Sequence, residues 1–300
     1  MSQRVNVAIA AVAVLGLGGA AFLWLHNRTG AAPAIAAAPM AAPAPAENPA
    51  TAPENPTIGA PAPASRPLEA KKTAAPEPDA GPPMRSGEIL DYIADVSKLS
   101  NVAQLRLQTA EKRNFQGKSA WHLQAFAHTE SPLRMVFELD DQFDSYSDAG
   151  TMSSLQYEMH LSERGQKVDS IQRMTTTGKE PAPPDATETR VLPGTRDPLG
   201  MMQYLRNVDW SKTPEVHGPV YDGRKLYDVR ATLSGTSAAV TVPAGSYAAN
   251  KIEIRVFTNG EEMKDAHFYL YLDHDAVRTP VLLEANLPFA TARVALASKK

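Results

Sequence analysis

The chain has 300 residues, with 30 basic and 33 acidic side chains, a formal net charge of -3 and no cysteine. This near balance provides no broad attraction to a polyanion, so we do not expect a nucleic-acid partner. The lack of cysteine excludes disulfides, thiolate metal sites, a cysteine nucleophile and a lipidated cysteine.

The first 30 residues predict a membrane anchor. Residues 5–25 are apolar apart from Asn6, and a helix of that length is about 31 Å long, enough for a hydrocarbon core of about 30 Å. Arg4 and the free amino terminus favour a cytoplasmic start. We therefore expect residues 1–30 to form a single-pass inner-membrane anchor that places the rest of the chain in the periplasm. The alternative is a signal peptide cleaved near Ala38, which also exports everything downstream.

Residues 31–85 predict a disordered linker. They are almost entirely alanine and proline with scattered polar residues, and most of the chain's 25 prolines lie here. Proline removes backbone donors and alanine has little area to bury, so this segment cannot build a core. We expect an extended spacer between the anchor and one folded domain of residues 86–300.

Period-two alternation from residue 86 onward predicts a mainly β domain. Turn residues at 114–117, 163–165 and 259–260 mark hairpins. We expect the oxygen-rich segment Asp140–Asp148 to be an acidic loop, and residues 178–195 to be a proline-rich loop. The predicted strands are Glu88–Val96, Val102–Thr109, Ser119–His128, Leu133–Leu139, Leu155–Leu161, Val168–Thr175, Tyr221–Leu233, Ala238–Val242, Asn250–Thr258, Ala266–Asp273, Pro280–Asn286 and Thr291–Ala297.

One short helix is predicted over Asp197–Asn207. Asp197 suits the N-cap and Pro198 the first helical position, while Leu199, Met202 and Leu205 share one face. Because sequential short strands with tight turns favour antiparallel pairing, we expect a curved antiparallel sheet, a half-barrel or open barrel, with this single helix.

Four segments resemble an exported bacterial family known as domain of unknown function 3108. They are Ser86-Gly-Glu-Ile-Leu-Asp-Tyr92, Asp197-Pro-Leu-Gly-Met-Met-Gln-Tyr-Leu-Arg206, Val240-Thr-Val-Pro-Ala-Gly245 and Arg278-Thr-Pro-Val281. The resemblance spans roughly residues 86–297. It implies a fold similar to that of the periplasmic lipoprotein carriers, in which a curved antiparallel sheet surrounds an apolar cavity, and it implies no established activity.

The usual signatures of catalysis are absent from the sequence. There is no H-E-x-x-H, G-x-S-x-G, S-x-x-K or Walker-type motif. His122 and His128 would lie about 20 Å apart along one strand, too far for one metal ion. Asp140–Asp148 lacks the spacing of a calcium loop. We therefore expect no catalytic residue, no metal, no cofactor and no enzyme.

The function predicted is non-enzymatic binding of an apolar or amphipathic ligand, lipid or lipoprotein-like, in the curved sheet. The alternative is a structural or protein-interaction module of a cell-envelope assembly, and a filled rather than an empty concavity would favour it. Arg206 and Arg278 would anchor an anionic head group, or else pair locally with carboxylates or cap the helix. The predicted ligand-binding residues are Leu105, Leu107, Trp121, Leu123, Tyr204, Arg206 and Arg278.

Overall fold

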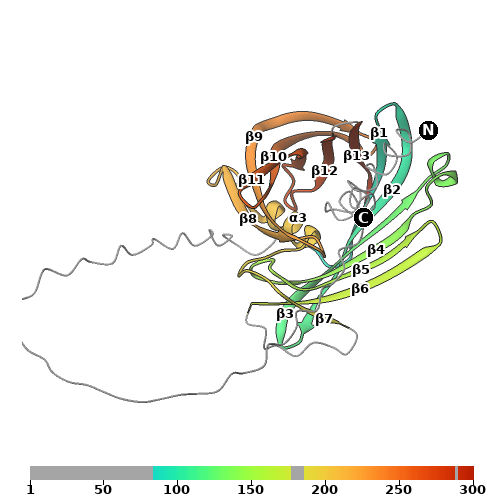
Figure 1. Ribbon diagram of the computed structural model, residues 1–300. Helices are drawn as coiled ribbons and strands as arrows, with labels where there is room; N and C mark the ends of the chain where they lie inside the picture. Colours follow the sequence, from blue (N-terminus) through green and yellow to red (C-terminus); the bar gives the residue numbers. More distant parts are fainter. Residues whose placement is uncertain (1–83, 177–185, 288–289) are drawn as a thin grey trace, which may run out of the picture.

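A computed structural model describes residues 84–176, 186–287 and 290–300 (Figure 1). The predicted anchor of residues 5–25 and the predicted linker up to residue 83 lie outside these residues. Within them, no helix combines the length and hydropathy that crossing a membrane requires. Met84, one residue before the predicted end of the linker, is already buried in the core.

Thirteen strands of the described chain form one sheet. They are β1 (Glu88–Val96), β2 (Leu99–Phe115), β3 (Lys118–Thr129), β4 (Asp140–Asp148), β5 (Ser154–Glu163), β6 (Gln166–Thr175), β7 (Thr187–Arg190), β8 (Glu215–Tyr221), β9 (Leu226–Val242), β10 (Gly245–Thr258), β11 (Glu261–Asp273), β12 (Pro280–Leu287) and β13 (Ala290–Lys299). A 3-10 helix, η1 (Leu133–Met135), and one α-helix, α3 (Pro198–Asn207), complete the described elements.

The sheet consists of two meanders that share a central seam. Its strand order is β7-β6-β5-β4-β3-β2-β1-β13-β12-β11-β10-β9-β8, so the first and last strands of the chain lie side by side in the middle. All neighbours pair antiparallel except β6 and β7, which are parallel. The prediction of a mainly β domain with a curved, essentially antiparallel sheet and one short helix is confirmed for the described residues.

The two outer edges of the sheet come together because the sheet curls. The segment after β7 pairs with β8, where the Arg196 amide donates to the Pro219 carbonyl at 3.0 Å and the Tyr221 amide to the Arg196 carbonyl at 2.8 Å. Gln172 of β6 donates to the carbonyl of Gly223, in the turn after β8, at 2.5 Å. The two edges are thus joined by side chains and by the segment after β7, and not by a continuous ladder of strand hydrogen bonds.

Gly223 shows how close this approach is. Its φ is +96°, a backbone conformation that L-residues rarely adopt, and a Cβ there would collide with the end of the Met159 side chain on β5. Glycine therefore allows the β8–β9 turn to lie against the inner face of the first meander.

Helix α3 lies inside the curve of the sheet, beside β8 (Figure 1). The predicted cap is confirmed: Asp197 accepts a hydrogen bond from the Gly200 amide at 2.9 Å. All ten helical residues are buried, including Gln203 and Arg206. The sequence predicts one apolar face, but the sheet surrounds the helix, so its polar side chains are buried as well.

The predicted strand Leu133–Leu139 is wrong. This segment begins with the 3-10 helix η1 and joins the sheet only at its end, through a bridge between Leu139 and Glu163 and a hydrogen bond from the Thr129 amide to the Leu139 carbonyl. Leu133 and Phe137 are buried, whereas Met135 and Val136 are 79% and 63% exposed. Buried side chains four residues apart, as at Leu133 and Phe137, are typical of a helical turn. In a short segment that is mostly apolar, this period cannot be distinguished from that of a buried strand.

The predicted acidic loop Asp140–Asp148 is also wrong, because it forms strand β4 at the centre of the first meander. Its aspartates, serines and glutamine have low β-propensity, which conceals the strand in the sequence. In the fold they have hydrogen-bond partners on the neighbouring strands, so tertiary contacts outweigh the local preference.

Further boundaries differ from the prediction, among them the strand predicted over Val102–Thr109, which is part of the longer β2. The predicted strand Tyr221–Leu233 contains the turn between β8 and β9, and the predicted strand Ala238–Val242 continues β9. The loop predicted over residues 178–195 contains the short strand β7, and its residues 178–185 lie outside the described chain. Residues 234–237 look like turn material, but β9 accommodates them through irregular pairing with β10.

Gly200 provides a test of how tightly α3 fits. A Cβ there would lie 2.8 Å from Ser147 Oγ and 3.0 Å from the Met152 carbonyl oxygen. We expect Gly200→Ala to lower the free energy of unfolding by roughly 1–3 kcal/mol through overpacking, despite the better helix propensity of alanine. Gly150→Ala is the matched control, since its Cβ would meet only Asp148 at 3.6 Å. Urea denaturation measures the free energy of unfolding of both variants. An equal loss in Gly200→Ala and Gly150→Ala would contradict the tight fit of α3.

Candidate functional site

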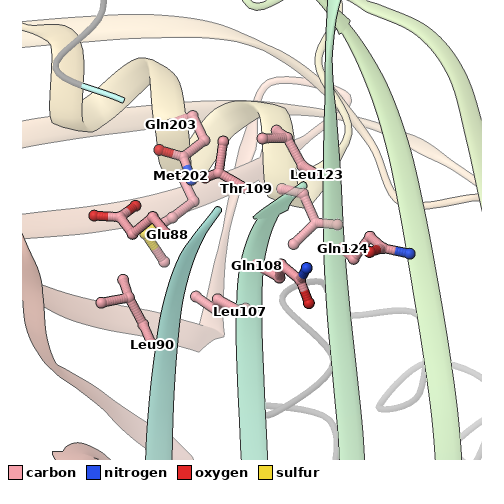
Figure 2. Close-up of a pocket in the computed structure, with 10 residues that line it drawn as sticks. Glu88, Leu90, Leu107, Gln108, Thr109, Leu123, Gln124, Met202 and Gln203 are labelled. Atoms are coloured by element: carbon pink, nitrogen blue, oxygen red, sulfur yellow. The ribbon is translucent and has the colours of Figure 1, made fainter. Parts of the chain in front are cut away.

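The candidate site is the contact region between α3 and the inner face of β1, β2 and β3. Figure 2 shows Met202 and Gln203 extending from α3 toward Glu88 and Leu90 of β1 and Leu107 of β2. A cavity of about 10 Å³ remains between them. This is room for about one water molecule, so the helix nearly fills the hollow at this place. Its lining residues are Glu88, Leu90, Leu107, Gln108, Thr109, Leu123, Gln124, Leu199, Met202 and Gln203.

The structure brings the four predicted apolar residues to one face. Leu105, Leu107, Trp121 and Leu123 are all buried on the inner side of β2 and β3. Only Leu107 and Leu123 line the cavity beneath α3. Trp121 lies near the start of β3, where the Lys112 ammonium is 5.8 Å from the centre of its ring. The convergence follows from strand alternation, and a ligand-binding role for these residues stays a prediction.

Tyr204 lies at a different place on α3. Its ring lies under the guanidinium of Arg196, whose central carbon is 3.7 Å from the ring centre. Arg196 also donates to the carbonyl oxygens of Thr151 at 2.8 Å and Gly194 at 3.2 Å. Burial lowers the pKa of Arg196. Tyr204 thus supports a buried cation beside the helix start, and no motif in the sequence reveals this contact.

Arg206 is fully buried and forms a two-pronged ion pair with Glu88. Its Nη1 and Nη2 donate to the two Glu88 carboxylate oxygens at 2.7 and 2.8 Å, and Nη2 also donates to the Val277 carbonyl at 2.8 Å. Arg278, which is half-buried, donates to the Arg206 carbonyl at 2.9 Å. The local alternative for Arg206, pairing with a carboxylate, is therefore present, and a role toward an anionic ligand stays a prediction for both arginines.

The other end of α3 is held by Asp197. This carboxylate is completely buried and accepts hydrogen bonds from Ser145 at 2.5 Å and from Ser154, as well as from the Gly200 amide. Burial raises the pKa of Asp197, although these hydrogen bonds oppose the rise. The helix is thus attached to β4 and β5 at its start and to β1 at its end.

Several residues of the site are not evident from sequence reasoning. Glu88, Thr109, Met202 and Gln203 line the cavity, but the sequence places each of them only on an expected strand or helix. The partner of Arg206 is 118 residues away, at Glu88. A charged residue at the start of a strand is common, so no local signal identifies this pair.

A second hollow lies at the surface, and Ser154, the hydrogen-bond partner of Asp197 at the start of α3, is among its lining residues. It has a volume of about 210 Å³ and is lined mainly by hydroxyl and aliphatic side chains near the β4–β5 turn and the segment after β7, including Thr151, Ser153 and Thr195. None of the predicted ligand-binding residues lines it.

Comparison with protein families identifies the chain. The family described as "Protein of unknown function (DUF3108)" matches residues 92–297. The chain belongs to this family. The match covers the domain from β1 to β13 and agrees with the resemblance of the sequence motifs. No curated protein matches the sequence significantly.

Solved structures similar to this DUF3108 domain have low sequence identity. A β-barrel-like DUF1849 protein of Brucella abortus has a TM-score of 0.46 at 10% identity, over 72% of this chain and 97% of its own. A candidate lipoprotein of Parabacteroides distasonis has a TM-score of 0.35 at 13% identity, over 74% and 100%. A candidate exported protein with a YmcC-like fold from Bacteroides fragilis has a TM-score of 0.33 at 10% identity, over 73% of this chain and 98% of its own.

The ion pair between Arg206 and Glu88 should be essential to this DUF3108 domain. Arg206→Ala leaves the nearly buried Glu88 carboxylate without its counter-charge, so we expect a loss of about 3–5 kcal/mol in the free energy of unfolding. Arg278→Ala removes one hydrogen bond to a carbonyl and should cost only about 1 kcal/mol. Chemical denaturation compares the two variants, and equal losses would argue against a dominant ion pair.

Asp141 on the inner face of β4 predicts a dependence of stability on pH. Burial raises the pKa of its carboxyl from 3.8 to about 7, although it accepts a hydrogen bond from the Ser162 amide. Because the folded state holds this proton more tightly than the unfolded chain, stability is lost as pH rises from about 4 to 7 and the loss is complete above 7.

Asp141→Asn should remove this loss. We expect it to raise the free energy of unfolding by roughly 1–4 kcal/mol at pH 8 and by little near pH 4, measured by urea denaturation at both values. The neighbouring Asp140 is the control, because its hydrogen bond with Arg134 lowers its pKa. Asp140→Asn should lower stability at pH 8. A gain for Asp141→Asn that is the same at both pH values would show that its ionisation is not the cause.

Proposed function

We propose that this protein is a non-enzymatic, membrane-tethered envelope domain that binds an apolar or amphipathic ligand in the hollow of its curved sheet. The observation that carries the proposal is the position of α3, which covers the apolar inner face of β1–β3 and is itself buried on all sides. In the described arrangement the helix occupies the space that a ligand would need.

The envelope location rests on the sequence. Residues 5–25 are long and apolar enough to export the chain and to anchor it, and the alanine- and proline-rich residues that follow suit a spacer. A ligand-binding domain on such a tether would act at or near the outer surface of the inner membrane.

The chemistry of the hollow suits an amphipathic ligand. Leu90, Leu107 and Leu123 provide apolar surface on the sheet. Glu88 and Gln203 lie at the same cavity and can exchange hydrogen bonds with a polar head group. Outward movement of α3 would expose this combination to a ligand.

The attachments of α3 are of a kind that can open. Its two ends are held by polar contacts, those of Asp197 to Ser145 and Ser154 and those of Arg206 to Glu88. Water or a charged head group can replace such contacts, whereas a continuous strand ladder would resist separation.

One observation favours the second candidate, a protein-interaction module. The hollow beneath α3 is filled to within about 10 Å³, as expected of an ordinary core. In addition, Met135 and Val136 expose apolar side chains on the connection between β3 and β4, where a protein partner can contact them. The two candidates differ in whether α3 must move.

A disulfide that locks α3 distinguishes them. The chain contains no cysteine, so Gly200→Cys with Ser147→Cys introduces one defined pair. A Cβ at Gly200 lies 2.8 Å from Ser147 Oγ, close to the roughly 3 Å between a Cβ and the far sulfur of a disulfide. We expect a fragment of residues 84–300 with this pair to bind a fluorescent fatty-acid probe only after reduction.

The same variant before and after reduction is its own control, and the unsubstituted fragment should bind the probe under both conditions. Leu123→Ala should weaken probe binding by removing apolar surface that the probe would contact, while Val168→Ala, on the exposed surface of β6, should leave it unchanged. Probe binding that is equal in the oxidised and reduced double variant, or absent from the unsubstituted fragment, would contradict ligand binding in the hollow and favour the protein-interaction module.

A further inference from the structure

A cluster of metal-ligating side chains lies on the outer face of the sheet, opposite to the face that contacts α3. One ligand atom each from Asp144 of β4 and from Glu158 and His160 of β5 lie within 4.8 Å of one another. Ligands of a single divalent ion that are bound at about 2.0–2.2 Å are necessarily within such a distance of each other. Two adjacent strands of a paired sheet hold all three side chains.

The two carboxylates of the cluster face each other. Asp144 and Glu158 are direct register partners across β4 and β5. Their side chains are only 6% and 16% exposed. Like charges directly opposite each other destabilise a sheet, and burial strengthens the repulsion. In the described chain, the basic side chains that contact these carboxylates are the imidazoles of His122 and His160.

Asp144 is held rigidly by three neighbours. His122 Nε2 and Gln124 Nε2 lie 2.7 and 2.8 Å from its Oδ1, and Gln142 Nε2 donates to Oδ2 at 2.7 Å. A carboxylate has about four lone-pair positions, so at least one remains for a cation. Outer partners of this kind orient the ligands of metal sites and increase their affinity.

His160 is oriented in the same way. Its Nδ1 lies 2.7 Å from Asp169 Oδ1 on β6, so in the neutral ring Nδ1 would donate to Asp169 and Nε2 would offer the lone pair that binds a metal. Nε2 lies 3.6 Å from Glu158 Oε2, on the side where the carboxylates meet. A carboxylate that holds the non-ligating nitrogen of histidine is a frequent feature of zinc sites.

Gln156 could supply a fourth ligand. It is 5% exposed, its Nε2 donates to Glu158 Oε1 at 2.6 Å, and its Oε1 has no hydrogen-bond partner among the described residues. An orphaned buried oxygen is unfavourable. Turning the amide over would bring Oε1 toward the Glu158 carboxylate, and this becomes favourable when a cation is bound there.

We propose that Asp144, Glu158 and His160 bind one zinc ion, with the fourth position taken by water or by Gln156 Oε1. The combination of imidazole with two carboxylates suits zinc, whereas calcium and magnesium prefer sets made of oxygen alone. The ion would neutralise the facing carboxylates and link β4 to β5. This site is independent of the ligand hollow and of the movement of α3.

Zinc binding to the full-length protein tests the proposal. The protein is purified in detergent with an affinity tag free of histidine, stripped with a chelator and dialysed against zinc chloride. We expect one zinc per chain, measured by elemental analysis, and a higher midpoint of thermal unfolding with zinc than without it. Calcium chloride at the same concentration should leave the midpoint unchanged.

Three substitutions locate the ion. His160→Gln and Glu158→Gln remove ligands and should weaken zinc binding at least about tenfold. Asp169→Asn retains every ligand but releases His160, and should weaken binding about 10- to 100-fold. His128→Gln is the matched control. This histidine lies on the same face of β3 as His122, but it contacts Glu130, which is outside the cluster. Its zinc affinity should equal that of the unsubstituted protein.

Cobalt(II) gives a readout that does not depend on unfolding. Bound in place of zinc, it should give the intense visible absorption of a four-coordinate ion in the unsubstituted protein and in His128→Gln, whereas Asp169→Asn should need about 10- to 100-fold more cobalt to reach the same absorption. The proposal is overturned if less than one zinc binds, if His128→Gln weakens binding as much as the cluster variants, or if calcium raises the midpoint as zinc does.

Discussion

The arrangement depends on one constraint: a helix with polar residues along it is enclosed by a sheet, so each buried polar group needs a partner from the surrounding strands. Asp197 obtains its partners from β4 and β5, and Arg206 obtains Glu88 from β1. Burial of these groups without partners would cost several kcal/mol each. The residues that supply the partners lie 43, 52 and 118 residues away in the chain, so the sheet must curl for the helix to be accommodated.

Close approach is the second part of this constraint. Gly200 places the first turn of α3 against Ser147, and Gly223 places the β8–β9 turn against Met159. Both contacts lie between the two meanders or between helix and sheet. A Cβ at Gly200 would lie 3.0 Å from the Met152 carbonyl oxygen, whereas at Gly223 it would strain the backbone and displace the end of the Met159 side chain.

The two faces of the first meander have different chemistry. Its inner face has the leucines that contact α3, and its outer face has the array of His122, Asp144, Glu158 and His160. Strand β4 has buried side chains on both faces. Most of its polar residues are therefore buried or partly buried within the domain and do not form a solvated loop. A ligand in the hollow and a cation on the outer face would act on opposite sides of the same strands.

The sequence by itself determines the class of the domain. Alternation predicts most of the strands, the Asn259-Gly260 and Arg164-Gly165 pairs predict two hairpins, and Asp197 with Pro198 predicts the start of α3. These are local signals, since backbone period, turn conformation and helix caps depend on a few adjacent residues. The inward position of Leu105, Leu107, Trp121 and Leu123 follows from the same period.

Only the tertiary structure decides the pairings between distant residues. Glu88 as the partner of Arg206, Arg196 over Tyr204, and the meeting of Asp144 with Glu158 and His160 depend on the register of strands and on the curl of the sheet. The same dependence makes Asp140–Asp148 a strand and Leu133–Leu139 a turn with a 3-10 helix. Local propensity differs by at most about 1 kcal/mol per residue, so hydrogen bonds and burial supplied by other strands override it. Whether a residue of the inner face lines a hollow or fills a core is likewise a property of what packs above it, here the helix α3.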